Sequence, residues 1–478
     1  MRLLLQEIPH APPLDAVAAR LSRTPSLVWL RSGGEPTAQS RYSLLAARPF
    51  LTVRTRGTRC ELHAGTSRRT QFGNPWPLLD HLLSRYEMLD ELDLPFPAGG
   101  CFGYWGYDLK NFSEPRLPRR AVDDLELPDA YLGFYDSLVV FDRELGKTWI
   151  IATGLRVDGS RSQAAAQAAV DFWRAQLDLA AKEPHAENRS LPAEAHAVAS
   201  NFTRENFLAA TRRALQYIRA GDIYQVNLSQ RFAVPWAQSG WALFDALCRH
   251  SAAPFAAYLN CDGLEIASAS PERFFHLSGA HAQTRPIKGT RPRGHDADAD
   301  ARLAHELQTS AKENAELVMI TDLLRNDLGR ICEFGSVMVP ELARLERFPQ
   351  VQHLVSTVEG RLKAGTTHLT ALRECFPGGS ITGAPKIRAI EIIDELEPVT
   401  RGPYTGCIGY LGFNRESQLS IAIRTALVHE GTARFQTGAG IVADSDPEAE
   451  YEETLAKAGG FFAAVQPARA AWPQPFFP

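Results

Sequence analysis

Short strands joined by tight hairpin turns are the feature that most restricts the fold of this 478-residue chain. Between residues 224 and 443, runs of strand length are separated by turns such as NRES (414–417) and HEGT (429–432), which are typical of β-hairpins. Helical patterns fall between these strands at 298–330, 367–375, 384–396 and 447–465. Hairpin-joined strands with helices gathered between them favour an α+β fold with large antiparallel sheets over a doubly wound parallel fold.

The remaining segments divide the chain into regions. Residues 1–151 are short apolar runs broken by Gly and Pro, with one helix predicted at 77–86, and a further helix is predicted at 160–182. Residues 183–199 lack apolar periodicity, which predicts a linker, and Thr203 then caps a helix that runs to Ile218. We therefore expect an N-terminal region at 1–182, a linker at 183–200, a second region at 201–466 and a tail at 467–478.

The composition excludes several classes of function. The net charge of −4 provides no basic field for nucleic acid or an anionic membrane surface. The seven cysteines lack Cys-x-x-Cys spacing, which argues against a disulfide framework or a zinc site. No run approaches the length of a membrane span, and the apolar start before Pro9 is too short for a signal peptide. A cytoplasmic location is expected.

Two helical stretches carry paired carboxylates. Glu450 and Glu453 are spaced i, i+3 on one predicted helix, with Lys457 a turn further along. Glu313 and Glu316 repeat this spacing on another helix. Two such turns facing each other would offer the oxygen-only environment that Mg²⁺ accepts, although a single Glu-x-x-Glu is usually a solvated helix face.

Several other side chains could carry chemistry. Lys288 lies in a tight turn after a strand, and lysine becomes a useful nucleophile where desolvation lowers its pKa, by roughly 3 to 5 units when fully buried. Glu272 ends another strand and could act as a general acid. Arg401 and Arg424 have apolar neighbours, so each needs an anionic partner, either an internal carboxylate or a ligand. The alternating strand at 224–232 turns four polar residues to one face, so this face borders water or lines a polar cavity: Gln225, Asn227, Ser229 and Arg231.

The chain contains a sequence that resembles the nucleophile motif of glutaminases, but its context is unsuitable for catalysis. Cys101 lies in a Gly-x-Cys-x-Gly sequence, and His185 with Glu187 follows at His-x-Glu spacing. A nucleophile elbow needs a buried strand leading into it, whereas LDLPFPAGG supplies two prolines, and His185 falls in the predicted linker. We reject this interpretation.

Ten ordered motifs resemble the chorismate-utilising family that includes anthranilate synthase component I and aminodeoxychorismate synthase component I. The resemblance runs from about Arg41 to Phe462 and implies two large antiparallel sheets packed as a sandwich with helices on the outside. The motifs are GGCFGYWGYD (99–108), GDIYQVNLSQRF (221–232), SASPERF (268–274), PIKGTRPRG (286–294), KENAELVMITDLLRNDLGR (312–330), VQHLVSTVEG (351–360), FPGGSITGAPK (376–386), RGPYTGCIGY (401–410), IAIRT (421–425) and TGAGIVADSDPEAEYEETLAK (437–457).

The resemblance implies a role for each matching residue. Glu316 and Glu453 would hold Mg²⁺ directly, supported by Glu313 and Glu450, and the metal would grip the ring carboxylate of chorismate. Other matching positions would contact the substrate's enolpyruvyl carboxylate or its ring: Tyr404, Arg424, Gly438, Ala439, Gly440, Lys457, Gly289, Thr290, His353 and Thr382.

A few positions distinguish the reactions that different members of the family catalyse. Aminodeoxychorismate synthases carry Lys in the PIKGT motif, as here at Lys288, whereas anthranilate synthases usually carry Ala. Isochorismate and salicylate synthases place a water-activating Lys where this chain has Gln225. The expected reaction is therefore amination of chorismate at C4, with Lys288 as covalent nucleophile and Glu272 as proton donor. A separate glutaminase subunit should supply the ammonia, and a separate lyase should finish 4-aminobenzoate.

The resemblance also implies a tryptophan pocket in the N-terminal region, although SAAPFAAYL departs from the family's Asn-Pro-Ser-Pro-Tyr pattern. Its positions are Ser32, Gln39, Ser40, Arg41, Tyr42, Pro254, Phe255 and Ala256. Two alternatives remain open: anthranilate synthase component I, and a non-catalytic tryptophan-binding or scaffolding subunit.

Overall fold

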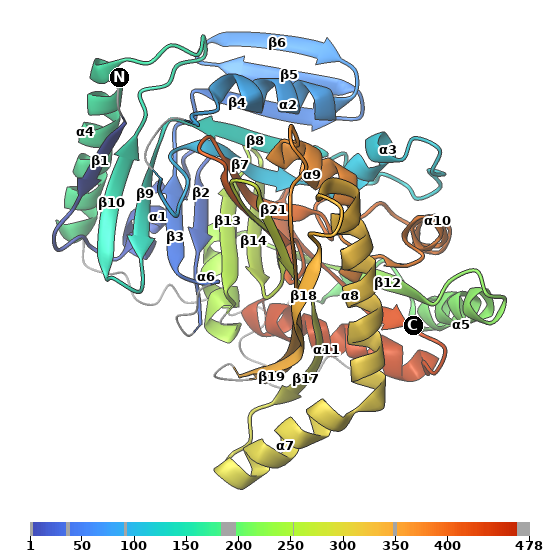
Figure 1. The fold of residues 1–478 in the computed structure, drawn as a ribbon. Coiled ribbons are helices and arrows are strands. Elements are labelled where there is room, and N and C mark those ends of the chain that lie inside the picture. The colour runs from blue at the N-terminus through green and yellow to red at the C-terminus, as the bar shows by residue number, and fades with distance from the viewer. Residues whose placement is uncertain are drawn as a thin grey trace.

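Two antiparallel sheets form the body of the protein. The computed structural model describes residues 3–34, 39–89, 93–182, 197–251, 253–347 and 351–465, and within these ranges each sheet has twelve strands (Figure 1). Both sheets combine strands from the first 152 residues with strands from beyond residue 199, so the two predicted regions are joined through continuous hydrogen-bonded sheets. The predicted α+β fold with large antiparallel sheets is confirmed.

The first sheet runs, in spatial order, through eleven strands, with a twelfth, β20, paired to β12. Its strands are β1 (Leu4–Glu7), β10 (Lys147–Ala152), β9 (Ser137–Asp142), β3 (Tyr42–Ala46), β2 (Val28–Arg31), β13 (Phe255–Asn260), β14 (Leu264–Ser270), β23 (Thr425–His429), β24 (Thr432–Ile441), β12 (Gln225–Pro235), β11 (Ala199–Ser200) and β20 (Gly383–Ala384).

The second sheet has the same organisation, with β18 paired to β19 outside the main order. Its strands are β17 (Ile287–Pro292), β19 (Val351–Arg361), β16 (His281–Arg285), β15 (Arg273–Ser278), β22 (Glu416–Ile421), β21 (Cys407–Gly412), β7 (Gly100–Trp105), β8 (Ala130–Tyr135), β4 (Leu51–Arg56), β5 (Arg59–Ala64), β6 (Ser67–Phe72) and β18 (Met338–Arg347).

The helices cover the outer faces of the two sheets. They are α1 (Leu14–Leu21), α2 (Pro75–Tyr86), α3 (Lys110–Ser113), α4 (Gln163–Lys182), α5 (Arg204–Arg219), α6 (Gly240–His250), α7 (Ala297–Thr309), α8 (Ala311–Ile331), α9 (His368–Cys375), α10 (Lys386–Leu396) and α11 (Pro447–Val465), with 3₁₀ turns η1 (Tyr107–Leu109) and η2 (Gly379–Ile381). Figure 1 shows α7 projecting from the body of the molecule beside β17 and β19.

The main core lies between the sheets. Leu44 and Val140 of the first sheet belong to the same buried cluster as Phe102 and Leu132 of the second. Separate clusters pack α1, α4, α6 and α11, and then α5 and α10, against the first sheet. Burial of apolar surface on this scale is the dominant stabilising contribution, and the predicted sandwich with outer helices is confirmed.

Three local predictions were wrong. The helix predicted at 298–330 is two helices, because Ser310 is extended and its hydroxyl caps α8 through the Glu313 amide (3.3 Å). Helices α1, α3 and α6 were not predicted. The end of the predicted linker pairs with β12 as strand β11, whereas residues 183–196 lie outside the described ranges.

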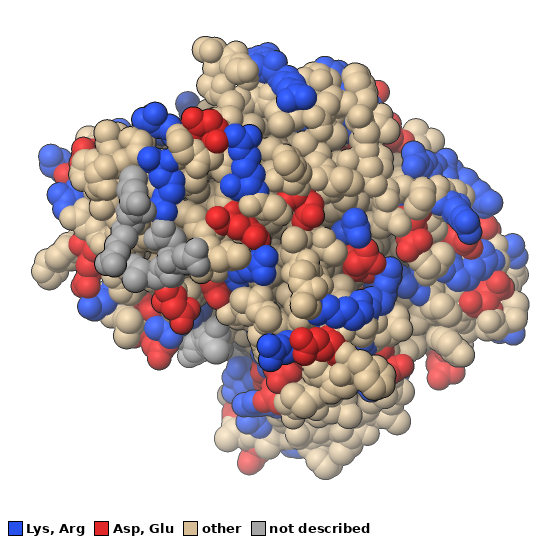
Figure 2. Space-filling view, turned by 45° about the horizontal axis from the view of Figure 1, so that its top comes forward, with Lys and Arg blue, Asp and Glu red and all other residues tan. Residues whose placement is uncertain are grey.

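The surface agrees with the charge balance. Figure 2 shows Lys and Arg interspersed with Asp and Glu across the face in view. In the part of the chain that the structure describes, no helix has the length and apolar character needed to cross a membrane.

Candidate active site

A cavity of about 670 Å³ opens between α8, β17, α11 and the ends of β12 and β24. Segments far apart in the sequence meet here, because both sheets and both carboxylate-bearing helices border the cavity. It collects most of the predicted site residues: Glu272, Lys288, Gly289, Thr290, Glu313, Glu316, His353, Tyr404, Arg424, Gly438, Gly440, Glu450, Glu453 and Lys457.

Helix capping fixes the carboxylates at this cavity. Ser310 and Glu313 form the start of a capping box, which places Glu313 in the first turn of α8 and Glu316 one turn later. Asp446 accepts a hydrogen bond from the Ala449 amide (3.0 Å) at the start of α11, so Glu450 also lies near a helix N-terminus. A carboxylate in this position is favoured by the helix dipole.

Each carboxylate has a different environment. Glu316 accepts hydrogen bonds from Lys288 Nζ (2.9 Å) and Gln225 Nε2 (2.9 Å), and Glu453 from Lys457 Nζ (2.6 Å). Burial raises the pKa of Glu450 above its ordinary value, and its Oε1 accepts a hydrogen bond from Ser445. Its Oε2 is buried and has no hydrogen-bond partner within the described ranges.

The four glutamates of the cavity offer oxygen donors of the kind that a hard cation such as Mg²⁺ prefers. No three His, Cys, Asp or Glu side chains of the described residues approach closely enough to enclose a metal ion by themselves. Magnesium, however, is usually held by one or two carboxylates with waters and substrate oxygens. Glu313, Glu316, Glu450 and Glu453 line one cavity with oxygen donors alone, and Glu450 Oε2 is an unpaired buried acceptor. These residues fit the expected Mg²⁺.

Lys288 is the lysine held deepest in the cavity, with 18% of its side chain exposed. Burial works to lower the pKa of Lys288, but the charges of Glu316, Glu272 and Glu453 outweigh it and the pKa is raised. The desolvation considered from the sequence is present, and the neighbouring carboxylates reverse its effect. Lys288 is therefore a cation while paired to Glu316.

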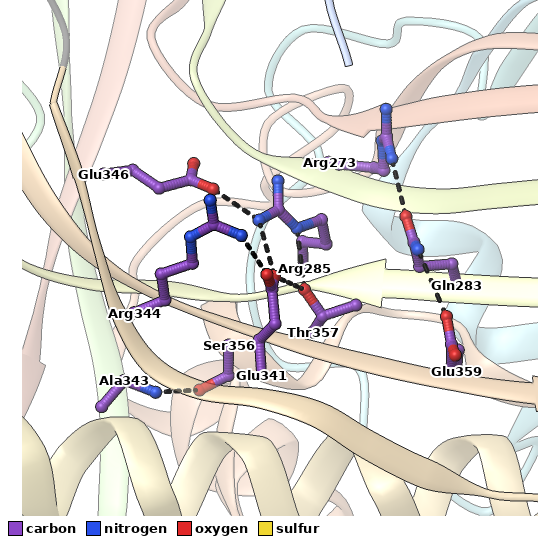
Figure 3. Close-up of polar contacts among 10 residues, drawn as sticks. All are labelled: Arg273, Gln283, Arg285, Glu341, Ala343, Arg344, Glu346, Ser356, Thr357 and Glu359. Carbon is purple, nitrogen blue, oxygen red and sulfur yellow. Dashed lines mark hydrogen bonds and ion pairs between the residues drawn. The ribbon is translucent and has the colours of Figure 1, made fainter. Parts of the chain in front are cut away.

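A polar cluster behind β17 holds the Lys288 strand in place. Arg285, at the end of β16, donates to Thr357 Oγ1 (3.0 Å) and to Glu346 (2.6 Å), and it also contacts Glu341 (Figure 3). These partners come from β18 and β19, so one guanidinium joins three strands two residues before β17 begins. The cluster fixes the point at which β16 ends and the chain turns into β17.

Arg285→Ala is expected to lower the free energy of unfolding by about 1–3 kcal/mol, because Glu346 and Glu341 would lose a buried donor yet remain partly solvated. Arg344→Ala provides the matched control: Arg344 pairs with the same Glu341 but is 60% exposed, so its cost should stay below about 1 kcal/mol. Denaturant unfolding of both variants measures the difference. Equal losses would show that Arg285 is no more important than a surface arginine.

Glu272 follows the end of β14 and is 8% exposed. Burial raises the pKa of Glu272 above its ordinary value, although Ser380, Lys288 and Lys457 oppose the shift. A carboxyl that keeps its proton to higher pH suits the predicted role of proton donor.

The raised pKa of Glu272 predicts the direction in which the stability of the protein changes with pH. The folded protein keeps the Glu272 proton after the unfolded chain has lost it, so this group's stabilising contribution is present at low pH and is lost as pH rises from about 4.5 through the folded pKa. Glu272→Gln cannot ionise. The melting temperature of the variant relative to wild type should therefore increase with pH between about 4 and 7, as thermal melts across that range would measure. A difference that is constant with pH would contradict the shift.

The same cavity also holds groups that could bind an anion. Burial lowers the pKa of Arg424, which makes no ion pair with any described residue. Tyr404, Gly438, Gly440 and Lys457 line the same cavity. Arg424 is half-buried and has no internal carboxylate as partner, so of the two partners weighed from the sequence, the geometry favours a ligand for Arg424. Arg401 is the opposite case, since it pairs internally with Glu397 (2.7 Å).

Of the residues expected to contact the ring of the substrate, Gly289, Thr290 and His353 line the cavity and Thr382 does not. Thr290 Oγ1 is hydrogen bonded to His353 Nδ1 (2.9 Å), and burial lowers the His353 pKa to about 4, so this imidazole is neutral. Gly289 has φ +67°, and a Cβ there would come within 2.8 Å of Leu307. Thr382 does not line the cavity, because its hydroxyl donates to the Gly378 and Gly379 carbonyls. The Ala439 side chain packs in the α5–α10 core instead.

Sequence reasoning missed some lining residues. Ser380, Gln436 and Lys312 border the cavity. Asn227 also lines it, and here a signal existed: this residue belongs to the polar face of the alternating strand, for which a polar cavity was one of the two expected surroundings.

The predicted tryptophan positions line a separate cavity of about 300 Å³. Seven of the eight border it; the exception is Ser40, which is buried and whose carbonyl accepts from Arg143. Arg41 is neutralised by Asp142 (2.7 Å) and Glu144 (2.9 Å), and burial raises the pKa of Glu416 on the far wall to about 7. The pocket exists, and its ligand stays a prediction.

Cys101 is no nucleophile. It lies inside β7 in the middle of a sheet, where burial raises the pKa of its thiol far above the ordinary value. His185 lies outside the described residues. The thiolate that catalysis would require is disfavoured, in agreement with the rejection of the glutaminase motif.

Comparisons with known proteins agree with this geometry. Residues 39–463 match the family model described as chorismate binding enzyme, so the chain belongs to that family. It is 41% identical over 439 residues to aminodeoxychorismate synthase component 1 of Klebsiella aerogenes, covering 91% of this chain and 93% of the relative. It is 40% identical over 445 residues to anthranilate synthase component 1 of Acetivibrio thermocellus, covering 91% and 89%. The crystal structure of anthranilate synthase component I from Streptococcus pneumoniae superposes with a TM-score of 0.79 at 30% identity, covering 90% and 93% of the two chains.

Proposed function

We propose that this protein aminates chorismate at C4 with ammonia to give 4-amino-4-deoxychorismate, the precursor of 4-aminobenzoate and folate. The observation that carries the proposal is the position of Lys288, which lies in the same cavity as the buried acid Glu272, the unpaired Arg424 and four metal-suited carboxylates. Relatives named aminodeoxychorismate synthase component 1 support it.

In the proposed reaction, Lys288 first gives up a proton to solvent and becomes a neutral amine. Its Nζ then bonds to ring C2 as the C4 hydroxyl leaves, and Glu272 protonates that hydroxyl so that it departs as water. Ammonia bonds to C4, the bond from C2 to the lysine breaks so that Lys288 leaves as an amine, and the new C4 ammonium returns one proton to the Glu272 carboxylate. Arg424 and Tyr404 hold the enolpyruvyl carboxylate. When bound to Glu316 and Glu453, with Glu313 and Glu450 in support, Mg²⁺ would grip the ring carboxylate and offset its negative charge.

The name component 1 of the relatives supports a second subunit. We assign to it the glutaminase activity that supplies ammonia, and a separate lyase would complete 4-aminobenzoate. The 300 Å³ pocket in the N-terminal region is proposed to bind tryptophan, with the indole between Pro254, Phe255 and the neighbouring strands.

Anthranilate synthase component 1 is the competing function, because relatives with that name are equally similar. One assay separates the two: the protein is incubated with chorismate, Mg²⁺ and ammonium at alkaline pH, with and without the lyase. We expect 4-aminobenzoate only when the lyase is added. Fluorescent anthranilate formed without lyase would establish the competitor instead. Calorimetry of chorismate with Mg²⁺ tests the non-catalytic alternative, which failure to bind would favour.

A further inference from the structure

The loop that joins α9 to α10 borders the catalytic cavity, yet the proposed reaction gives it no role. It spans residues 376–385, carries the sequence FPGGSITGAP, and contains η2 and β20. Ser380 and Ile381 of η2 line the cavity. The Ser380 hydroxyl is hydrogen bonded to the Glu272 carboxyl and favours the ionised form of that group. The loop therefore touches the proposed proton donor through one side chain.

A buried ion pair closes the base of this loop. Lys386, the first residue of α10, donates from Nζ to Asp327 Oδ2 of α8 (2.6 Å) and to the main-chain carbonyl of Cys375 (3.0 Å), the residue directly before the loop. The side chains of Lys386 and Asp327 are 12% and 3% exposed. One ammonium thus joins the two ends of the loop and ties both to the helix that carries Glu313 and Glu316.

The ammonium of Lys386 depends on Asp327. Lys386 lies in the first turn of α10, where the helix dipole disfavours a positive charge. Burial also removes water from both charged groups, and their attraction together with further hydrogen bonds compensates for this loss. Burial accordingly raises the pKa of Asp327, and the charge of Lys386 opposes that shift. Loss of either partner would leave the other charge buried and release the end of the loop.

The middle of the loop is held so that a displacement at its base reaches Ser380. Gly379 packs directly on α8, because a Cβ at this position would lie 2.6 Å from the Leu323 side chain. The Thr382 hydroxyl donates to the Gly379 carbonyl (3.2 Å) and so closes the turn around Ser380. Ser380 therefore lies in a turn with an internal hydrogen bond that rests on α8, and the position of its hydroxyl depends on that of the whole loop.

We propose that Lys386 and Asp327 are positioning residues: by closing the loop onto α8, they hold the Ser380 hydroxyl against the Glu272 carboxyl. This inference rests on the proposed function, in which Glu272 is the proton donor. Lys288 and Lys457 also face Glu272 and favour its ionised form through their charge. Ser380 is neutral, so its effect depends on the geometry of one hydrogen bond. The loop thus helps to set how readily Glu272 gives up its proton.

Ser380→Ala tests the contact itself. The reaction needs a protonated Glu272 and a neutral Lys288, so the pH profile of kcat/KM for chorismate, with free ammonia held constant, should show two apparent pKa values, the lower governed by Glu272. Without the Ser380 hydrogen bond the ionised carboxylate is less stable, and the lower value should rise by about 0.5–1 pH unit. An unchanged lower value would overturn the role of Ser380.

Lys386 is tested together with its partner, because Lys386→Met alone would leave the Asp327 charge buried. The double variant Asp327→Asn/Lys386→Met should raise the lower apparent pKa as Ser380→Ala does. Adding Ser380→Ala to it should change that value by less than about 0.2 pH unit, since both act on one hydrogen bond. Lys363→Met is the matched control: Lys363 donates to the Arg330 carbonyl of α8 (2.6 Å) but is exposed, so the profile should not change.

A merely structural role for the ion pair gives a different result. The double variant would then melt at a lower temperature but keep the wild-type lower apparent pKa, and this outcome would overturn the inference. Fully additive shifts in the triple variant would also overturn it, because the loop and Ser380 would then act separately. If the double variant does not fold, Asp327→Asn, which keeps the shape of the site and weakens the ion pair, decides the question by the same shift.

Failure of the proposed function would look different from failure of this inference. Wild-type protein that does not aminate chorismate at C4 with ammonium would remove the reaction itself, whatever the variants do. Wild-type protein that forms the expected product, with variants whose lower apparent pKa does not move, would remove only the positioning role of the loop.

Discussion

Lys288→Ala is expected to abolish amination of chorismate at C4, with a fall in kcat/KM of about 10³-fold or more, because a covalent step cannot proceed without its nucleophile. The loss should appear in kcat, since Arg424 and the carboxylates proposed to hold the substrate remain. Coupled formation of 4-aminobenzoate with the lyase measures it. The fold should persist: Glu316 loses its lysine but keeps the hydrogen bond from Gln225.

Lys312→Ala is the matched control for this variant. Lys312 borders the same cavity from the first turn of α8 but is exposed. Its removal changes the charge of the cavity by the same amount, so it should alter the rate by no more than about threefold. If Lys288→Ala retains full activity, or gains anthranilate formation, Lys288 is not the nucleophile and the anthranilate synthase assignment gains.

The fold was predictable where the sequence pattern is local. The hairpin turns and the helices at 367–375, 384–396 and 447–465 were placed correctly, because each depends on caps and periodicity within a few residues. The order of strands was not predictable. The pairing of β2 with β13, or of β7 with β21, joins segments more than 200 residues apart, and a single sequence contains no signal for such contacts.

The break between α7 and α8 illustrates a different limit. Ser310 followed by Glu313 is a capping signal inside an otherwise helical pattern, and the continuous periodicity concealed it. The cap matters for function, because it aims Glu313 and Glu316 at the cavity. The capping signal was therefore present in the sequence, but the prediction gave more weight to the helical periodicity than to the cap.

The site was more predictable than its electrostatics. Motifs bring Lys288, Glu272 and the four glutamates to one cavity. The pKa of Lys288, however, is raised rather than lowered, since its sign depends on the distance to Glu316. Thr382 likewise turned inward, because the backbone of η2 offered its hydroxyl two carbonyls. Such orientations follow from tertiary contacts and not from residue type.

Arg424 presents the clearest demand for a ligand in the cavity. Its backbone has φ +49°, an unfavourable conformation for a side chain of this size, and burial lowers the pKa of its guanidinium. An anion that pairs with the guanidinium would offset the desolvation of its charge, and a carboxylate such as the enolpyruvyl group of chorismate has the planar geometry that arginine binds bidentately.

Arg424→Gln should therefore raise the KM for chorismate about 10²-fold or more, since two charge-assisted hydrogen bonds contribute roughly 3–4 kcal/mol and each 1.4 kcal/mol is a factor of ten. The free energy of unfolding should stay constant or increase, because an unpaired buried charge is removed. Steady-state kinetics measure the change in KM, and denaturant unfolding measures the change in the free energy of unfolding. Arg291→Gln, at the rim of the same cavity and already paired with Glu306 (2.9 Å), should change the KM less than about fivefold. An Arg424 variant that is destabilised with an unchanged KM would identify a structural residue instead.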